Sequence, residues 1–501
     1  MNTVTHLASL IMAIAVLLSL PAVAQADDVA GRWSASRAQD WYGKQPWLVG
    51  CNFVPSTAVN DVEMWQAETF DPKTMDRDLG WAHTLGFNTV RVFLNFVVWK
   101  ADPGGLKKRF DQFLGIADRH HIKTMVVLLD DCFKQNPHVG KQDDPVPGVH
   151  NSQWVASPGE GMVKNPGDWA VLEQYVKDMV HAFAHDRRVV VWDLYNEPSQ
   201  SLALVEEVFR WAREVAPDQP LTSCVYGGSC DPAKLADLSD IISFHNYSDL
   251  PEVKKMVDHL SAYHRPLLCT EWMRRPESRF ETHLPYFKEQ KIGAWNWGLV
   301  AGRTQTYFSW GSSVGAPEPD RWFHDILHAD GAPFDRWEVR VIRGVTGASP
   351  PLKTLVPTAE NGPVAWRYTL EQPPVGWREP DFDDRSWESG MAPFGREEMP
   401  IARKPNTVWT SADIWLRREV ELPRGKYSDL ALVVHYDEDP EVFIDGVLAW
   451  KARGFNASYE LVAIDPAAAD LLRKPGKHTL AVHCHQTVGG QYIDLGIAGA
   501  P

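Results

Sequence analysis

Two glutamates of this chain stand where apolar runs end. Glu197 closes the segment that runs from Val189 through Tyr195-Asn196-Glu197-Pro198, and Glu271 ends the run that begins at Pro266. Apolar runs of this length are typical of buried strands, so both acids are expected at strand ends. A carboxylic acid that protonates a leaving oxygen, together with a carboxylate that attacks the neighbouring carbon, is the pair that cleaves a glycosidic bond. The two glutamates predict this kind of acid/base and nucleophilic chemistry.

Eight β-rich segments alternate with amphipathic segments between residues 47 and 300. Strict alternation of this kind predicts a parallel sheet, and eight repeats predict a closed (β/α)₈ TIM barrel in an α/β fold. The alternative is an open doubly wound sheet, which usually has fewer strands and a Gly-rich phosphate turn that this sequence does not show. The expected strands are Trp47–Phe53, Thr89–Leu94, Thr124–Leu129, Val189–Tyr195, Leu221–Val225, Ile241–His245, Leu267–Glu271 and Gly293–Val300, and the expected helices are Pro72–Leu85, Leu106–His121, Trp169–His185, Leu202–Val215, Glu252–His264 and Ser278–Gln290.

The order of the expected strands predicts where the two glutamates lie in the barrel. Glu197 follows the fourth expected strand and Glu271 ends the seventh, so both should lie at the carboxyl-terminal mouth of the barrel, where active sites of this fold form. The long connections 130–168 and 301–321 also follow strands. We expect them to form the walls of a substrate cleft at this mouth.

The pattern changes after residue 345, where long amphipathic helices give way to short strands and turns. The sequence predicts a signal peptide at residues 1–26, a catalytic barrel at 27–345, a linker at 346–355 and an all-β jelly-roll sandwich at 356–501. The strands expected in the sandwich are Ala412–Leu422, Leu430–His435, Glu441–Ile444, Ala449–Lys451 and His478–His485.

The net charge of the chain limits the classes of partner and substrate that it can bind. The 501 residues carry a net charge of −15, which disfavours nucleic acid, anionic membranes and polyanionic substrates. A neutral substrate fits better, and 22 Trp and 13 Tyr supply the aromatic faces on which uncharged sugar rings stack, although most of these rings are expected in the core.

The first residues predict export. Leu7–Leu20 is apolar but too short to span a membrane, and Ala24-Gln25-Ala26 is a small-x-small cleavage site, so the mature chain should begin near Asp27 and be secreted or periplasmic. Six cysteines permit disulfides without proving them, and Cys224 and Cys230 could close a small loop. No ligand spacing indicates a metal or another cofactor, and we expect none.

These residues resemble those of glycoside hydrolase clan A, and the barrel, over residues 45 to 330, looks most like family 5. The resemblance implies that Glu197 is the general acid/base, that Glu271 is the nucleophile, and that Asn196 hydrogen-bonds the 2-hydroxyl of the sugar. Two loop carboxylates in surface ion pairs are the alternative reading of the glutamates.

Four further positions match the family pattern. Arg91 would hold the nucleophile ionised, since a nearby guanidinium lowers a carboxyl pKa. The resemblance implies that His245 and Tyr247 form the His-x-Tyr pair whose hydroxyl orients the nucleophile, and that Trp297 is the floor beneath the sugar. Arg91 as a capping ion-pair residue, His245 as a satisfied core histidine and Trp297 as simple packing remain open alternatives.

One segment departs from the family pattern. Family 5 members often carry a His just after the third strand, where this chain has Asp130-Asp131-Cys132. The C-terminal part resembles galactose-binding-like sandwiches, on the segments Asp381–Trp387 and Asp437–Gly446. Sugar binding, Ca²⁺ binding and a structural role are all compatible with it.

The resemblance implies an exported, retaining β-glycoside hydrolase acting on a neutral glycan such as a xylan, glucan or mannan. An exo-acting β-galactosidase or β-mannosidase of the family 2 type is one alternative, although its sandwich normally precedes the barrel. A non-catalytic carbohydrate-binding surface protein is another, from a different class.

Overall fold

The computed structural model describes residues 29–397, 404–423, 425–427, 429–456 and 458–500. The predicted signal peptide therefore lies outside the described residues. The chain divides into two compact units, residues 1–335 and 336–501. Helix α12 (Arg336–Thr346), which the sequence analysis assigns to the barrel segment, belongs to the second unit by this division.

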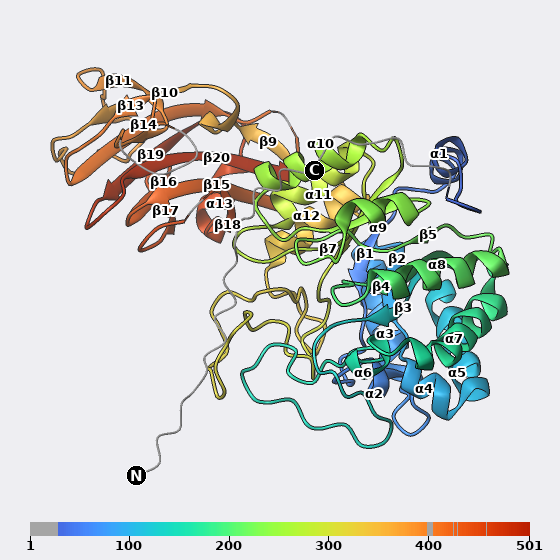
Figure 1. Ribbon diagram of the computed structural model, residues 1–501. Helices are drawn as coiled ribbons and strands as arrows, with labels where there is room; N and C mark the ends of the chain where they lie inside the picture. Colours follow the sequence, from blue (N-terminus) through green and yellow to red (C-terminus); the bar gives the residue numbers. More distant parts are fainter. Residues whose placement is uncertain (1–28, 398–403, 424, 428, 457, 501) are drawn as a thin grey trace, which may run out of the picture. The chain divides into compact units, whose positions relative to one another are not determined.

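The first unit is a parallel (β/α)₈ barrel, as the sequence predicts (Figure 1). Its strands are hydrogen-bonded in the order β5-β4-β3-β2-β1-β8-β7-β6. The ring closes just beyond the end of β5, where Val225 forms a parallel bridge to Phe244 of β6. The strands are β1 Val49–Asn52, β2 Thr89–Phe93, β3 Lys123–Asp130, β4 Val189–Asn196, β5 Leu221–Thr222, β6 Ile242–His245, β7 Leu267–Trp272 and β8 Gly293–Asn296.

The barrel strands are buried on both faces because helices cover their outer side (Figure 1). Burial of both faces is why the strands read as nearly continuous apolar runs instead of alternating ones. Helix α3 is an example of how the sequence marks the start of a helix. The Asp71 side chain caps its first turn, and Pro72 is its first residue. The helices of this unit are α1 Ala35–Gly43, α2 Asp61–Trp65, α3 Pro72–Thr84, α4 Phe96–Ala101, α5 Pro103–Arg119, α6 Glu160–Val163, α7 Trp169–Phe183, α8 Leu202–Val215, α9 Pro232–Leu238, α10 Leu250–Ser261 and α11 Phe280–Glu289, with a 3₁₀ turn, η1, at Pro166–Asp168.

Three barrel strands are shorter than predicted by several residues. β1 covers Val49–Asn52 where the sequence predicts Trp47–Phe53. β5 is only two residues long, and β8 ends at Asn296. Trp297 therefore follows β8 and is not part of it, and the next residue, Gly298, has a φ of +82°. This left-handed conformation turns the chain away from the sheet, and a side chain there would be strained. The apolar residues Leu299 and Val300 extend the run in the sequence but not the strand.

The register of the barrel brings polar side chains to one level at its carboxyl end. Asn52 of β1 pairs with Arg91 of β2. Asp130 of β3 pairs with Asn196 of β4. His245 of β6 pairs with Glu271 of β7. Because parallel strands end together at the same rim, these pairs lie around one mouth.

The second unit is an all-β sandwich, as predicted. Its two sheets run β11-β10-β14-β19-β16-β17 and β13-β12-β20-β15-β18, and β9 pairs with β20. Apart from the parallel pair β12–β13, the pairs are antiparallel. The strands are β9 Lys353–Val356, β10 Val364–Thr369, β11 Glu388–Ala392, β12 Phe394–Gly395, β13 Thr407–Val408, β14 Asp413–Glu421, β15 Asp429–Asp437, β16 Pro440–Ile444, β17 Val447–Lys451, β18 Glu460–Ala463, β19 Lys477–His485 and β20 Tyr492–Ala500, with helix α13 at Pro466–Leu472 and a 3₁₀ turn, η2, at Ala359–Asn361.

The sandwich has a core of its own, in which side chains from both sheets pack together, including Trp366, Leu416, Leu432 and Ile497. Facing sheets of this kind are held by the interdigitation of alternate residues. Among the described residues, no helix is long and apolar enough to cross a membrane.

The cap of α3 can be tested by stability. Asp71→Ala removes the acceptor of the Thr74 amide hydrogen bond, and we expect it to lower the free energy of unfolding by about 1 kcal/mol. The measurement is denaturant unfolding followed by tryptophan fluorescence. Asp118→Ala, on the exposed surface of α5, is the control and should change stability little. Equal effects of the two substitutions would contradict the capping role.

Candidate active site

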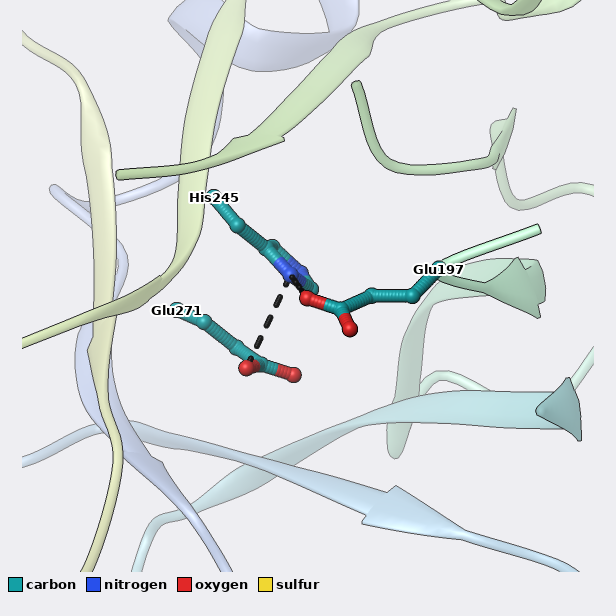
Figure 2. A group of neighbouring side chains, drawn as sticks. All are labelled: Glu197, His245 and Glu271. Atoms are coloured by element: carbon teal, nitrogen blue, oxygen red, sulfur yellow. Dashed lines mark hydrogen bonds and ion pairs between the residues drawn. The ribbon is translucent and has the colours of Figure 1, made fainter. Parts of the chain in front are cut away.

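Glu197 and Glu271 meet at the mouth of the barrel. Glu197 follows the last residue of β4, and Glu271 is the fifth residue of β7. Figure 2 shows their side chains pointing into one space, with the His245 ring beside both. One oxygen of each carboxyl group and one ring nitrogen of His245 all lie within 4.8 Å of one another. The two acids thus lie together at the barrel mouth, where the strand count places them. Glu271 pairs with the buried Arg91 and Glu197 contacts the buried His245, so neither forms the surface ion pair of the alternative reading.

A single buried arginine connects Glu271 with the floor of the site. Arg91 is fully buried, and its Nη1 donates to Glu271 Oε1 and to Asn52 Oδ1, both at 2.8 Å. Its Nε and Nη2 donate to Asp193 Oδ2 at 3.0 and 2.8 Å. Nη2 also donates to Asn196 Oδ1 at 2.7 Å. The planar guanidinium, with five N–H donors, suits a position that must hold several oxygens at fixed angles.

Glu271 is held at both oxygens. Arg91 occupies Oε1, and the Tyr247 hydroxyl donates to Oε2 at 2.8 Å. Burial raises the pKa of the Glu271 carboxyl, and the nearby Glu197 adds to the rise, while Arg91 and Tyr247 oppose it. The family resemblance predicts that Arg91 keeps the pKa of Glu271 low. The guanidinium acts in that direction, but the net shift is upward because desolvation of the buried carboxylate outweighs it.

Glu197 has a different environment. Its Oε1 lies 2.8 Å from His245 Nδ1, and its Oε2 accepts a hydrogen bond from the Cys132 thiol, with an Sγ–O distance of 3.2 Å. Among the residues that the structure describes, no lysine or arginine lies within ion-pair distance of Glu197. Burial raises the pKa of its carboxyl. The Cys132 hydrogen bond and the charge of Arg91 oppose this rise. Arg91 forms its ion pair with Glu271, however, so the guanidinium stabilises the ionised form of Glu271 by direct contact.

The backbone of Glu197 is constrained as well. Its φ is +44°, in the left-handed region, a conformation that costs a non-glycine residue about 1–3 kcal/mol. Its N–H donates to Cys224 Sγ at 3.1 Å, and its carbonyl accepts from the Tyr226 hydroxyl at 3.1 Å. These contacts keep the side chain turned into the barrel mouth, where it is 21% exposed. Cys224 and Cys230 are both free thiols, so the small loop between them is not closed by a disulfide.

His245 is a neutral imidazole between the two acids. Burial lowers the pKa of its ring to about 3, so its contact with Glu197 is a hydrogen bond between the ring and the carboxyl group and not an ion pair at neutral pH. Its Nδ1 also lies 3.6 Å from Glu271 Oε2. His245 is thus part of the site and not a core histidine satisfied elsewhere.

Asn196 is fixed by the segment in which the chain departs from the family pattern. Its Nδ2 donates to Asp130 Oδ1 at 2.9 Å, and Trp154 Nε1 donates to the other oxygen of Asp130 at 2.7 Å. With Arg91 on its own oxygen, the Asn196 amide is locked in orientation. One N–H of this amide remains for a substrate hydroxyl, so its predicted contact with the sugar stays a prediction.

Trp297 belongs to an aromatic cluster beside the acids. Its ring meets Phe93 and Trp154 edge-on, with both pairs of ring centroids 5.8 Å apart. The ring is only partly buried, so it has a free surface as well as packing partners. The predicted role as a floor beneath the sugar is compatible with this placement and stays a prediction.

Sequence reasoning did not find several residues that shape the site. Asp193 and Asn52 share the Arg91 guanidinium, and Cys132 contacts Glu197. The signal for Asp193 and Asn52 is a polar residue within an apolar strand run, which in a barrel interior demands a partner. For Cys132 the only signal in the sequence is that Asp130-Asp131-Cys132 stands where family 5 members often carry a His.

Glu197, His245 and Glu271 also form a possible donor set for a metal ion, with two carboxylates and one imidazole. The surroundings fit such an ion poorly. Both oxygens of Glu271 already accept hydrogen bonds, and the Arg91 cation at 2.8 Å would repel a divalent ion. The arrangement fits a pair of carboxyl groups that exchange protons with a substrate.

Comparisons with known proteins find partial likenesses. No family model matches the chain. A curated α-L-rhamnosidase from Streptomyces avermitilis is 38% identical over 71 residues, which is 13% of this chain and 6% of that protein. The chain thus matches only a small fraction of the length of this curated relative.

Two solved structures that resemble part of this chain are glycoside hydrolases. One is a GH5_18 enzyme from Streptomyces cattleya, solved in complex with Manβ1-4GlcNAc. It is 14% identical to this chain, the alignment covers 61% of this chain and 82% of the enzyme, and the TM-score is 0.44. The exo-β-1,4-mannosidase Op5Man5 from Opitutaceae bacterium strain TAV5 is 17% identical, covers 60% of each chain, and has a TM-score of 0.41.

The role of Arg91 can be tested by stability. Arg91→Met leaves the buried Asp193 without its cation, and we expect a loss of about 3–5 kcal/mol in the free energy of unfolding of the barrel. Arg91→Lys should fall between this variant and wild type, because it keeps the charge and loses the fork. The measurement is denaturant unfolding.

The control is Arg210→Met, at an arginine that pairs with Glu207 on the surface of α8 and whose side chain is 50% exposed. It should leave stability nearly unchanged. A loss as small for Arg91→Met as for this control would contradict the central role of the guanidinium.

Proposed function

We propose that this chain is a retaining β-glycoside hydrolase in which Glu197 is the general acid/base and Glu271 is the nucleophile. One observation carries the proposal. Two carboxyl groups have oxygens within 4.8 Å of each other at the barrel mouth, and only one of them is held by a buried guanidinium. This asymmetry supports different roles for two chemically identical side chains.

The first step of the proposed reaction forms a covalent intermediate. The Glu271 carboxylate attacks the anomeric carbon while Glu197 gives its proton to the glycosidic oxygen, and the bond from the anomeric carbon to that oxygen breaks. Arg91 and Tyr247 hold Glu271 on its line of attack. Glu197 is left as a carboxylate, with His245 and the Cys132 thiol beside it.

The second step releases the sugar. Water enters where the leaving group has departed, Glu197 takes one of its protons, and the oxygen attacks the anomeric carbon as the bond to Glu271 breaks. Glu197 is again protonated and Glu271 is again a carboxylate. Two displacements on opposite faces retain the anomeric configuration.

The distance between the acids supports retention over inversion. Retaining enzymes place the two carboxyl groups about 5–5.5 Å apart, whereas inverting enzymes need about 6.5–9.5 Å to admit a water molecule between the general base and the sugar. A closest approach within 4.8 Å fits the shorter spacing.

For the substrate we propose a neutral β-linked glycan, of the xylan, glucan or mannan type. The net charge of −15 disfavours acidic polymers, and Trp297 and the exposed Trp310 offer aromatic surface near the acids. We also propose that the protein is exported, on the basis of the signal peptide that the sequence predicts at residues 1–26.

The two glutamate roles are tested by substitution and azide rescue. On β-glycans of xylose, glucose, mannose and galactose, Glu271→Ala should lower kcat by at least about 10³-fold, because the nucleophile is lost. Glu197→Ala should lower it by about 10²–10⁴-fold on unactivated substrates. Azide should rescue Glu271→Ala to give a glycosyl azide of inverted configuration, and Glu197→Ala, with an activated aryl glycoside, to give one of retained configuration.

The control is Glu252→Ala, at a glutamate whose side chain on α10 is 54% exposed, which should behave as wild type. Equal hydrolysis by wild type and Glu271→Ala would refute the nucleophile assignment. A wild-type chain that binds glycans without cleaving any would favour the binding-protein alternative. Release of single monosaccharides only would indicate exo action.

The pH dependence follows from the two carboxyl groups. The reaction needs Glu271 ionised and Glu197 protonated, so activity falls below the pKa of Glu271 and above the pKa of Glu197. Burial raises both pKa values above the ordinary 4.5 of glutamate. We therefore expect a bell-shaped profile of kcat/KM with its optimum above pH 4.5. Loss of activity on the acid side should persist in Glu197→Gln, and the alkaline limb should disappear. An alkaline limb that is unchanged in this variant would assign it to another group.

A further inference from the structure

Cys132 lies directly beside the proposed acid. It follows β3 by two residues, and its N–H donates to Asp130 Oδ1 at 2.9 Å, which fixes the turn that carries it. Its Sγ lies 3.2 Å from Glu197 Oε2. Within the described part of the chain the other side-chain contact of this carboxyl group is with His245, on the opposite oxygen.

The sulfur acts as a donor in this contact. Burial raises the pKa of the Cys132 thiol, and the negative charges of Asp130 and Glu197 raise it further. The group therefore stays as S–H at neutral pH, and a carboxylate beside it can only accept. A thiol hydrogen bond is weak, so it favours the carboxylate form of Glu197 without holding it in that form.

We propose that Cys132 is a positioning residue for Glu197, which orients its carboxyl group and tunes its proton transfer by donating a hydrogen bond to Oε2. This inference rests on the proposed function of Glu197. In the first step the acid becomes a carboxylate, and the thiol stabilises that product. In the second step the carboxylate must take a proton again, and a weak donor releases it readily. The hydrogen bond thus stabilises the Glu197 carboxylate enough to help it lose its proton in the first step, but not so strongly that it prevents proton uptake in the second.

The substitutions Cys132→Ala and Cys132→Ser separate donation from packing. The thiol and the charge of Arg91 are the two groups that lower the pKa of Glu197 against the effect of burial. Without the thiol only Arg91 remains, so this pKa rises and the alkaline limb of kcat/KM should move to higher pH in Cys132→Ala. Serine restores an O–H donor, so this limb should return to the wild-type position or below it. The acid limb, set by Glu271, should stay in place in both variants.

The control is Cys230→Ala. Cys230 is the other partly buried cysteine among the described residues, and its thiol does not contact Glu197, so the whole profile should match wild type. Superimposable profiles for all variants would overturn the proposal. A shift in Cys132→Ser equal to that in Cys132→Ala would overturn it as well, because it would trace the effect to packing and not to the donor.

A second readout does not depend on turnover. Carboxyl ¹³C resonances of glutamate-labelled protein are titrated by NMR, and the Glu197 signal is identified by its loss in Glu197→Gln. Cys132→Ala should raise the pKa of this signal, and Cys132→Ser should restore it. An unchanged titration would refute the inference even if the enzyme is active. A shifted titration in a chain that cleaves no glycan would support the contact and refute the proposed function.

Discussion

The buried Arg91 guanidinium is the interaction on which the site depends. It binds oxygens from β1, β4 and β7, namely those of Asn52, Asp193, Asn196 and Glu271. Transfer of a cation and two carboxylates from water into a barrel interior costs several kcal/mol per ion. That cost is offset only when nearly every donor finds an acceptor, and here the fork geometry of arginine achieves it. The same contacts that compensate the charge fix the position of Glu271.

This constraint also explains how two glutamates come to differ. Glu271 is buried and Glu197 is partly buried, and desolvation raises the pKa of both carboxyl groups. Glu271 shares a salt bridge with Arg91 and accepts from Tyr247, whereas Glu197 has a neutral imidazole and a thiol. Burial favours the protonated form of both acids, but the salt bridge with Arg91 favours the ionised form of Glu271. Glu197 is therefore the better site for the proton. The proposed assignment of acid and nucleophile rests on the neighbours of each glutamate, since the side chains themselves are the same.

Much of the fold and part of the site could be predicted from the sequence. The alternation of apolar runs and amphipathic segments is a local property, so the eight barrel strands and the sandwich strands β14, β15 and β19 were predictable within a few residues. The equally long strand β20 was not predicted. Glu197 and Glu271 were predictable because strand-end positions of one barrel share a rim, whereas Arg91, in the middle of β2, was predicted only from the family resemblance. The short strands β12 and β13 carry too few residues for a periodic signal, and the end of β8 is set by the turn at Gly298.

The partners of the site residues were not predictable in the same way. Asp193 and Asn52 meet Arg91 only because the barrel closes in the observed register. Cys132 reaches Glu197 through a loop path that no periodicity encodes. The net direction of the Glu271 pKa depends on how completely water is excluded, which sequence does not measure. Local patterns thus predict which residues lie at the mouth, and tertiary closure decides what each one touches.

The central claim is that Glu271 becomes covalently bound to the sugar. The most direct measurement incubates the chain with 2-deoxy-2-fluoro β-glycosides of glucose, mannose, xylose and galactose that carry a dinitrophenyl leaving group, and then maps labelled peptides by mass spectrometry. The fluorine slows the release of the intermediate, so it accumulates. The account predicts a fluoroglycosyl group on Glu271 for the sugar that the chain hydrolyses. A label on another residue, or hydrolysis of a parent glycoside without any labelling, would contradict it.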